Sequence, residues 1–131
     1  MLKWFKMINE RSEKMNNETE ILSKNFAKCR NLLTAIGDET RQHLIIEMIK
    51  IGDCNGIRVG KITEKTNLSR PAVSHHLQIM KKAGLVKVRK EGTKNFYYFD
   101  PDEEELDRLI SVLQSAKEIT KNLPDRSGEN D

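Results

Sequence analysis

The fold is decided by residues 67–85, which read NLSRPAVSHHLQIMKKAGL. Ser69 is a favourable helix N-cap, and Pro71 falls in the first turn, where its missing N–H costs little. Gly84 provides a C-terminal stop, because glycine readily adopts the left-handed conformation that ends many helices. These signals predict a helix from Ser69 to about Ala83, entered through a tight three-residue connection.

The predicted helix has one polar and one apolar face. At about 100° per residue, its polar side chains fall within roughly 140° of Arg70, and the apolar side chains occupy the remaining arc. The polar face suits a DNA major groove, since arginine can read guanine and glutamine can read adenine, although an ordinary surface helix would look the same. His76 lies in the apolar arc and is predicted to be a hydrogen-bonded core histidine. The candidate DNA contacts are Ser69, Arg70, Pro71, Ser74, His75, Gln78 and Lys82.

The flanking segments favour the DNA-binding interpretation. A short helix is predicted over 60–66, and two strands over 85–89 and 95–99 flank a turn. Two helices joined by a tight turn and followed by a basic hairpin are the organisation of a winged helix-turn-helix. Charged hairpin residues also protect a sheet edge from aggregation, and both roles can hold at once. The candidate wing contacts are Arg89, Lys90, Thr93 and Lys94.

Helical patterns fill most of the remaining chain. Apolar residues recur at helical spacing from about Glu18 to Ile36, and a last helix is predicted from an Asp100 cap to about Leu123. Between them, a helix from Asp38 to about Lys50 is expected to bury Leu44, Ile45, Met48 and Ile49. The expected fold class is therefore mostly α with a small β-hairpin wing. The expected domains are a leader over 1–17, mobile or extending an interface, a winged helix domain over 18–123, and a disordered tail over 124–131.

Composition excludes several classes of protein. The 131 residues are 37% hydrophobic and 33% charged, which suits one compact domain. No run approaches the roughly 18 apolar residues of a membrane span, the N-terminus does not fit a secretory signal, and two cysteines suit a cytoplasmic location. Charge is distributed unevenly along the chain. Residues 61–94 hold nine Lys/Arg and two acidic residues, whereas residues 100–131 hold four Lys/Arg and ten acidic residues. Such a concentrated positive stretch is typical of a polyanion-binding face.

Three motifs resemble the ArsR-type bacterial transcriptional regulators. They are the stretch from Ala35 to Arg41, reading AIGDETR, the run from Leu68 to Val86, and the wing from Arg89 to Lys94 that ends in Tyr97-Tyr98. The resemblance covers about residues 20–122 and implies operator binding through the helix at 69–83 and the wing, usually with repression of transcription. Double-stranded DNA is the implied partner.

The resemblance also implies a homodimer whose interface uses the first and last helices. A two-fold dimer would bind a palindromic operator with half-sites about one helical turn apart. An apolar stripe on the last helix is compatible with this interface, and ordinary intramolecular core would explain the same stripe. The candidate interface residues are Ile21, Leu22, Leu106, Leu109, Ile110, Leu113 and Ala116.

The metal sites of this family are not matched here. One family cysteine position is occupied by Arg58, and Cys54 lies in a loop without a Cys-x-Cys pair. At the second family site no histidine is present, and the nearest residues are Asp102, Glu104, Ser115 and Glu118. We therefore expect no metal ligands and no cofactor. Cys29 and Cys54 could form a redox pair, but Cys29 lies on an apolar helix face, which favours a buried structural thiol.

The sequence is also compatible with other functions. A metal- or thiol-responsive repressor of the same family is one, and a winged helix used for nonspecific DNA or protein binding is another. An enzyme is not expected, because the sequence has no phosphate-binding glycine loop, no paired carboxylates in an apolar setting and no nucleophile elbow. The inducer is not indicated.

Overall fold

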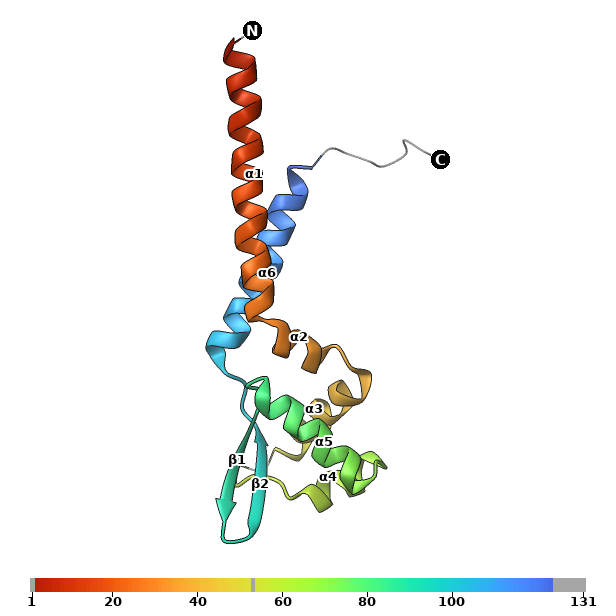
Figure 1. Cartoon of the computed structure of the whole chain (residues 1–131). Helices are drawn as coiled ribbons and strands as arrows, with labels where there is room; N and C mark the ends of the chain where they lie inside the picture. Colours follow the sequence, from red (N-terminus) through yellow and green to blue (C-terminus); the bar gives the residue numbers. More distant parts are fainter. Residues whose placement is uncertain (1, 53, 124–131) are drawn as a thin grey trace, which may run out of the picture. The chain divides into compact units, whose positions relative to one another are not determined.

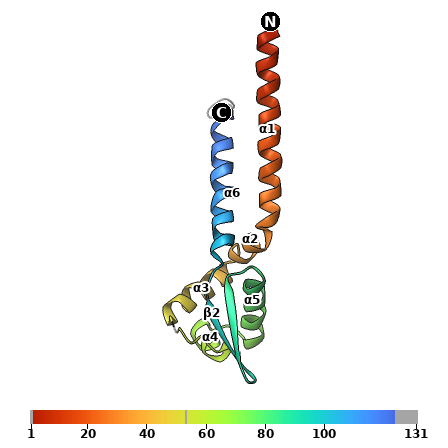
Figure 2. The ribbon, with the colours of Figure 1, turned by 90° about the vertical axis from the view of Figure 1, so that its left-hand side faces the viewer.

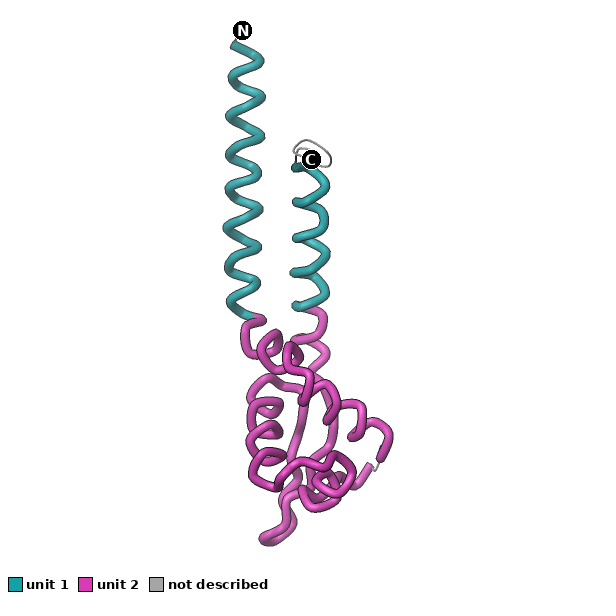
Figure 3. The backbone as a smooth tube through the Cα atoms, turned by 90° about the vertical axis from the view of Figure 1, so that its right-hand side faces the viewer, with its two compact units in different colours: residues 1–28, 108–131 teal, residues 29–107 magenta. Residues whose placement is uncertain are grey.

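The computed structural model describes residues 2–52 and 54–123. In chain order these residues form helices α1 to α5, the antiparallel hairpin β1–β2, and helix α6 (Figure 1). They divide into two compact units, coloured separately in Figure 3. One unit holds the described parts of 1–28 and 108–131, and the other holds 29–107. Across the described residues, no helix is both long and apolar enough to cross a membrane.

The first unit consists of α1 (Leu2–Lys28) and most of α6 (Glu103–Lys121). Within it the two helices run side by side (Figures 1 and 2). The helix predicted from Glu18 is wrong at both ends, because α1 already begins at Leu2 and stops before Cys29. Most of the expected leader is therefore regular helix, and its apolar residues belong to a helical face. The expected tail, 124–131, lies outside the described residues.

The second unit contains the helices α2 (Arg30–Ile36), α3 (Glu39–Ile51), α4 (Val59–Thr66) and α5 (Arg70–Lys82). Asp38 caps α3, since its Oδ1 accepts a hydrogen bond from the Arg41 amide at 3.0 Å. The predicted burial is only half right. Leu44 and Met48 are buried, but Ile49 is 53% exposed and Arg41 takes the third buried position of the helix.

The last four carbonyl oxygens of α2 are all hydrogen-bonded. The Leu33 oxygen accepts from the Gly37 amide at 2.9 Å, which leaves the final three oxygens for side chains of α3. Arg41 donates from Nη2 to the Thr34 oxygen at 2.9 Å and from Nε to the Ala35 oxygen at 2.8 Å. Gln42 donates to the Ile36 oxygen at 2.7 Å. Because unsatisfied carbonyls at a helix end are costly when buried, these bonds fix α2 against α3.

The hairpin pairs β1 (Val86–Glu91) with β2 (Lys94–Phe99), running from the Val86–Phe99 pair to the Glu91–Lys94 pair at the tip. A third segment joins its edge, because Ile57 exchanges two hydrogen bonds with Tyr97, of 2.6 and 2.8 Å. Gly56 precedes this bridge with φ +93°, and a Cβ there would lie 2.7 Å from the Phe96 Cβ. Only glycine fits such a conformation and such a close approach.

Helix α6 begins two residues later than its predicted start. The Asp102 oxygen accepts from the Leu106 amide at 3.1 Å, which places Asp102 at the N-cap. Asp100 therefore does not cap the helix; its carboxylate accepts instead from the Lys87 ammonium at 2.9 Å. The Asp102 amide also donates to the Gly84 oxygen at 2.8 Å, which links the start of α6 to the end of α5.

The core of the second unit draws on all of its elements. Most of its fully buried apolar side chains come from α2 to α5 and β1, and Tyr97 adds an aromatic ring from β2. Helix α5 contributes Val73, Leu77 and Met80, spaced four and three residues apart along one face. That spacing fixes the rotation of α5 about its axis and so decides which side chains it presents outward.

Candidate nucleic-acid interface

Helix α5 is built as the sequence predicts. The Ser69 Oγ accepts from the Ala72 amide at 3.2 Å, and Pro71 occupies the first turn. The connection from α4 turns at Asn67, whose φ of +57° lies in the left-handed region that asparagine tolerates. Helices α4 and α5 with this connection form the helix-turn-helix.

The outward face of α5 carries the predicted contact residues. Arg70, His75 and Gln78 are exposed, as are Ser69, Pro71 and Lys82, while Ser74 is half-buried. The Ser69 oxygen already accepts the capping hydrogen bond, and its hydroxyl proton is still free to be donated to a ligand. The face thus combines cationic groups, an amide and an imidazole, which together can donate to and accept from base edges.

His76 lies on the opposite side of α5 and contacts α3. Its Nδ1 is 3.3 Å from Nη1 of Arg41, so the predicted core role is matched in part: the ring is hydrogen-bonded but only half-buried. Burial lowers the pKa of His76, and the positive charge of Arg41 lowers it further. A neutral imidazole accepts from the guanidinium, and its protonation would break this contact.

The hairpin presents its charges unevenly. Lys90, Thr93 and Lys94 are exposed and surround the tip. Arg89 is also exposed but is already engaged, because it donates to the Glu91 carboxylate at 3.0 Å and to the Asn55 oxygen at 2.8 Å. Lys87 is bound to Asp100, and that hydrogen bond raises the pKa of its ammonium. The cations at the tip are therefore the more accessible ones.

Three residues of this region, Arg41, Arg58 and Phe96, could not be identified as partners from the sequence. Arg41 was visible only as part of a motif, although it hydrogen-bonds to α2 and contacts His76. Arg58 and Phe96 were not considered as a pair, yet the guanidinium of Arg58 lies 5.5 Å from the centre of the Phe96 ring. No local pattern indicates contacts between residues so far apart in the chain.

The predicted interface residues differ in how exposed they are in the structure. Ile110 and Leu113 are 53% and 55% exposed, and Ile21 is exposed on α1. Leu22, Leu106 and Ala116 are half-buried. Leu109 is only 8% exposed in the single chain.

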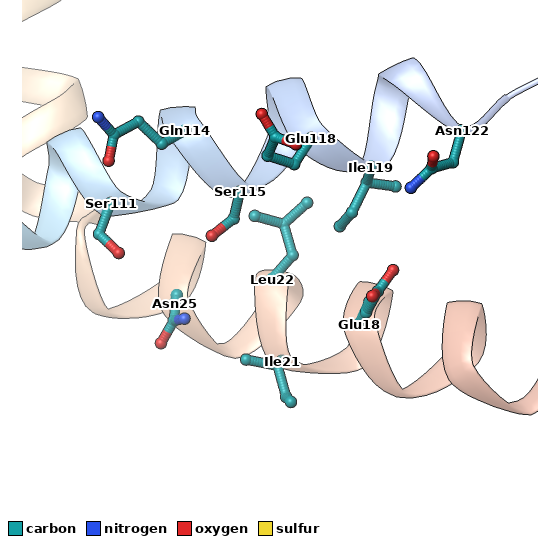
Figure 4. Close-up of a pocket in the computed structure, with 10 residues that line it drawn as sticks. All are labelled: Glu18, Ile21, Leu22, Asn25, Ser111, Gln114, Ser115, Glu118, Ile119 and Asn122. Carbon is teal, nitrogen blue, oxygen red and sulfur yellow. The ribbon is translucent and has the colours of Figure 1, made fainter.

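The first unit also contains an open groove between α1 and α6 (Figure 4). Its volume is about 330 Å³, and apolar Leu22 and Ile119 face polar groups that include Glu18 and Ser115. Glu118 lines the groove as well, where its carboxylate accepts from Lys121 at 3.0 Å.

Among the residues that the structure describes, no three His, Cys, Asp or Glu side chains gather as metal ligands would. Cys29 is buried, as predicted, and Cys54 is exposed.

The fold and this surface define a winged helix-turn-helix protein. The model of the bacterial regulatory protein arsR family matches residues 45–88. An uncharacterized HTH-type transcriptional regulator of Methanocaldococcus jannaschii is 39% identical over 89 residues, covering 67% of this chain and 97% of that protein. The chain belongs to the ArsR family of DNA-binding transcriptional regulators.

Other relatives agree with this assignment. The transcriptional repressor SdpR of Bacillus subtilis is 37% identical over 67 residues, which cover 51% of this chain and 70% of that protein. The solved structure of HlyU from Vibrio cholerae matches with a TM-score of 0.51 at 30% identity, covering 70% of this chain and 95% of that one. An ArsR-like regulator from Rhodococcus shares the fold, with a TM-score of 0.56 at 22% identity, covering 73% and 86%. SdpR and the Rhodococcus protein are both described as regulators of transcription.

Proposed function

We propose that this protein is a sequence-specific repressor that binds a palindromic operator as a homodimer. The observation that carries the proposal is the division of α5 into two faces. Val73, Leu77 and Met80 are buried, whereas Arg70, His75 and Gln78 face outward. Helix α5 would enter the major groove, and Lys90 and Lys94 at the hairpin tip would contact the flanking backbone. Such a protein acts in the cytoplasm, where the DNA is.

The dimer would form through the apolar side chains that one chain leaves exposed. Leu106, Ile110 and Leu113 lie on one side of α6, since they are four and three residues apart. In a two-fold dimer the same patch meets itself, so one stripe can supply both halves of the interface. Burying it would remove the apolar surface that a single chain leaves in water.

The N-terminal part of α1 would extend this interface. Trp4, Ile8, Met15 and Leu22 fall within about 40° of one another on the helix, and the last three are seven residues apart. Met15 and Leu22 are half-buried, whereas Trp4 is 58% and Ile8 42% exposed. This apolar stripe on α1 therefore continues into the residues expected to be a leader, where Trp4 and Ile8 are exposed. A second copy of the chain would cover these two residues.

The direction of regulation is proposed from the relatives. SdpR is described as a repressor, but a relative from Vibrio cholerae, 34% identical over 76 residues, is described as an activator. Repression requires only that the bound dimer blocks the promoter, so it needs no function of this chain beyond DNA binding. A regulator of the same fold that responds to metal or thiol oxidation is the alternative, and the exposed Cys54 is what keeps the thiol version open.

The test is binding of the full chain to the DNA upstream of its own gene, compared with random duplex at physiological salt. We expect selective binding, a protected two-fold site, and lower transcription from that promoter in vitro. Equal affinity for both duplexes would contradict sequence-specific binding. Activation of the promoter would contradict the proposed repression. Parallel titrations with EDTA and with reductant would reveal a metal or thiol signal.

A further inference from the structure

Phe96 on β2 carries two cations over one aromatic ring. The guanidinium carbon of Arg89 lies 4.6 Å from the ring centre, and that of Arg58 lies 5.5 Å from it. Each contact is favourable, because a cation is attracted to the ring face. The two guanidinium groups nevertheless repel each other, so their meeting at one ring requires an explanation.

The backbone holds all three side chains in place. Arg89 is directly opposite Phe96 in the hairpin register. Arg58 follows Ile57, whose two hydrogen bonds to Tyr97 bring it beside the same ring. Gly56 permits this approach, since any side chain there would collide with Phe96. The backbone therefore places Arg58 and Arg89 on segments that flank Phe96.

The charges at this ring are only half balanced. Arg89 is paired with the Glu91 carboxylate at 3.0 Å. For Arg58, the structure records the Phe96 ring as its interaction, and its side chain is exposed with no carboxylate within ion-pair distance among the described residues. Lys90 and Lys94 add further positive charge on the hairpin. A bound anion would relieve the repulsion, and a guanidinium fork is well suited to phosphate.

We propose that Arg58 binds a backbone phosphate of double-stranded DNA, positioned for it by the Phe96 ring. The inference rests on the proposed DNA-binding function and adds a contact outside both α5 and the hairpin tip. The contact is independent of base sequence, because it is made to the backbone. Arg58 would thus contribute affinity and orientation, while the face of α5 supplies the choice of bases.

The test compares Arg58→Gln with Arg58→Lys in the full chain, on operator and on random duplex. Each phosphate contact changes the slope of log K against log salt by about 0.9, so Arg58→Gln should flatten the slope by about that amount. We expect its affinity to fall about three- to tenfold on both duplexes. Arg58→Lys keeps a positive charge and should retain the slope. Arg30→Gln, which removes an exposed charge from α2, is the matched control and should leave the slope unchanged.

The outcomes separate this inference from the proposed function. If Arg58→Gln binds with the wild-type slope, Arg58 does not contact phosphate, even if affinity falls through a change in the wing. A thermal unfolding curve for each variant identifies such a structural loss. If the wild-type protein prefers no duplex over another, sequence-specific binding fails, and the slopes still decide whether Arg58 contacts the backbone. If the wild-type protein binds no duplex, both proposals fail.

Discussion

Nη1 of Arg41 on α3 lies 3.3 Å from Nδ1 of His76 on α5. The same arginine donates two hydrogen bonds to carbonyl oxygens at the end of α2. One side chain therefore connects three helices, and the helix with the proposed base-reading face is among them. The polar face of α5 is held in place from behind by a polar contact as well as by its buried apolar residues.

Replacement of Arg41 should destabilise the protein strongly. Arg41→Ala leaves the Thr34 and Ala35 oxygens without their donors, and lost bonds to a charged group of this kind cost on the order of 3 kcal/mol together. Urea unfolding would measure the loss. Arg30→Ala, at an exposed position of α2, should change the free energy of unfolding by less than about 0.5 kcal/mol. A similar small effect for Arg41→Ala would show that solvent replaces its bonds.

His76 should make stability depend on pH below 6.5. Burial lowers its pKa in the folded state from the ordinary value of 6.5, so the unfolded chain binds more protons as the pH falls through this range. The contribution of neutral His76 to the free energy of unfolding is fully present above about pH 6.5 and declines below it. The measurement is urea unfolding between pH 5 and 8 for His76→Gln and for the exposed His75→Gln. Only His76→Gln should reduce the change in the free energy of unfolding with pH. If His76→Gln leaves this pH dependence unchanged, another group is responsible for it.

Two glycines should respond in opposite ways to alanine. Gly56→Ala forces a side chain into a left-handed backbone and against Phe96, and we expect a loss above about 2 kcal/mol. Gly60→Ala lies in α4 with nothing within 4 Å of the new Cβ and should stabilise the helix by about 0.5–1 kcal/mol. Thermal unfolding of the two variants gives the comparison. Equal effects would mean that the loop before Ile57 shifts freely.

Arg70 and Lys94 should affect DNA binding differently. Arg70→Ala removes a proposed base-reading group and should cost about 1–3 kcal/mol of binding free energy on the operator, with a smaller loss on random duplex. Lys94→Ala should weaken both duplexes alike and flatten the salt slope by about 0.9. Anisotropy titrations over a range of salt measure both effects. Equal losses on both duplexes for Arg70→Ala would end its assignment as a base reader.

The free end of α1 should matter for dimer affinity. Trp4→Ser combined with Ile8→Ser removes the uncovered apolar residues of the stripe, and we expect dimer dissociation to become about tenfold or more easier. Sedimentation equilibrium measures the constant. Ile49→Ser, which removes an exposed isoleucine from α3, is the control and should not change it. An unchanged constant in the double variant would exclude the N-terminal end of α1 from the interface.

Local signals predicted the helix-turn-helix well because its residues act on their immediate neighbours. Ser69 and Asp38 cap the helices that follow them, and the spacing of Val73, Leu77 and Met80 marks the buried face. The break at Cys29 was missed because the apolar spacing continues across it. The base-reading and wing roles themselves stay predictions.

Contacts between distant residues could not be predicted in the same way. Asp100 and Asp102 are both acceptable caps, and the choice between them depends on the hydrogen bond from Lys87 to Asp100. Arg41 looks like a surface residue of a polar motif until the end of α2 is placed beside it. The convergence of Arg58 and Arg89 on Phe96 likewise depends on the bridge between Ile57 and Tyr97.

The hairpin begins and ends at one place. The Leu85 oxygen accepts from the Asp100 amide at 3.0 Å, and the Gly84 oxygen accepts from the Asp102 amide at 2.8 Å. The chain thus leaves the end of α5 and returns to the same point, whatever the length of the strands between. Residues inserted in register on both sides of the turn at Gly92 and Thr93 would lengthen the hairpin without displacing either helix. The reach of the hairpin can therefore change independently of the helix that is proposed to read the bases.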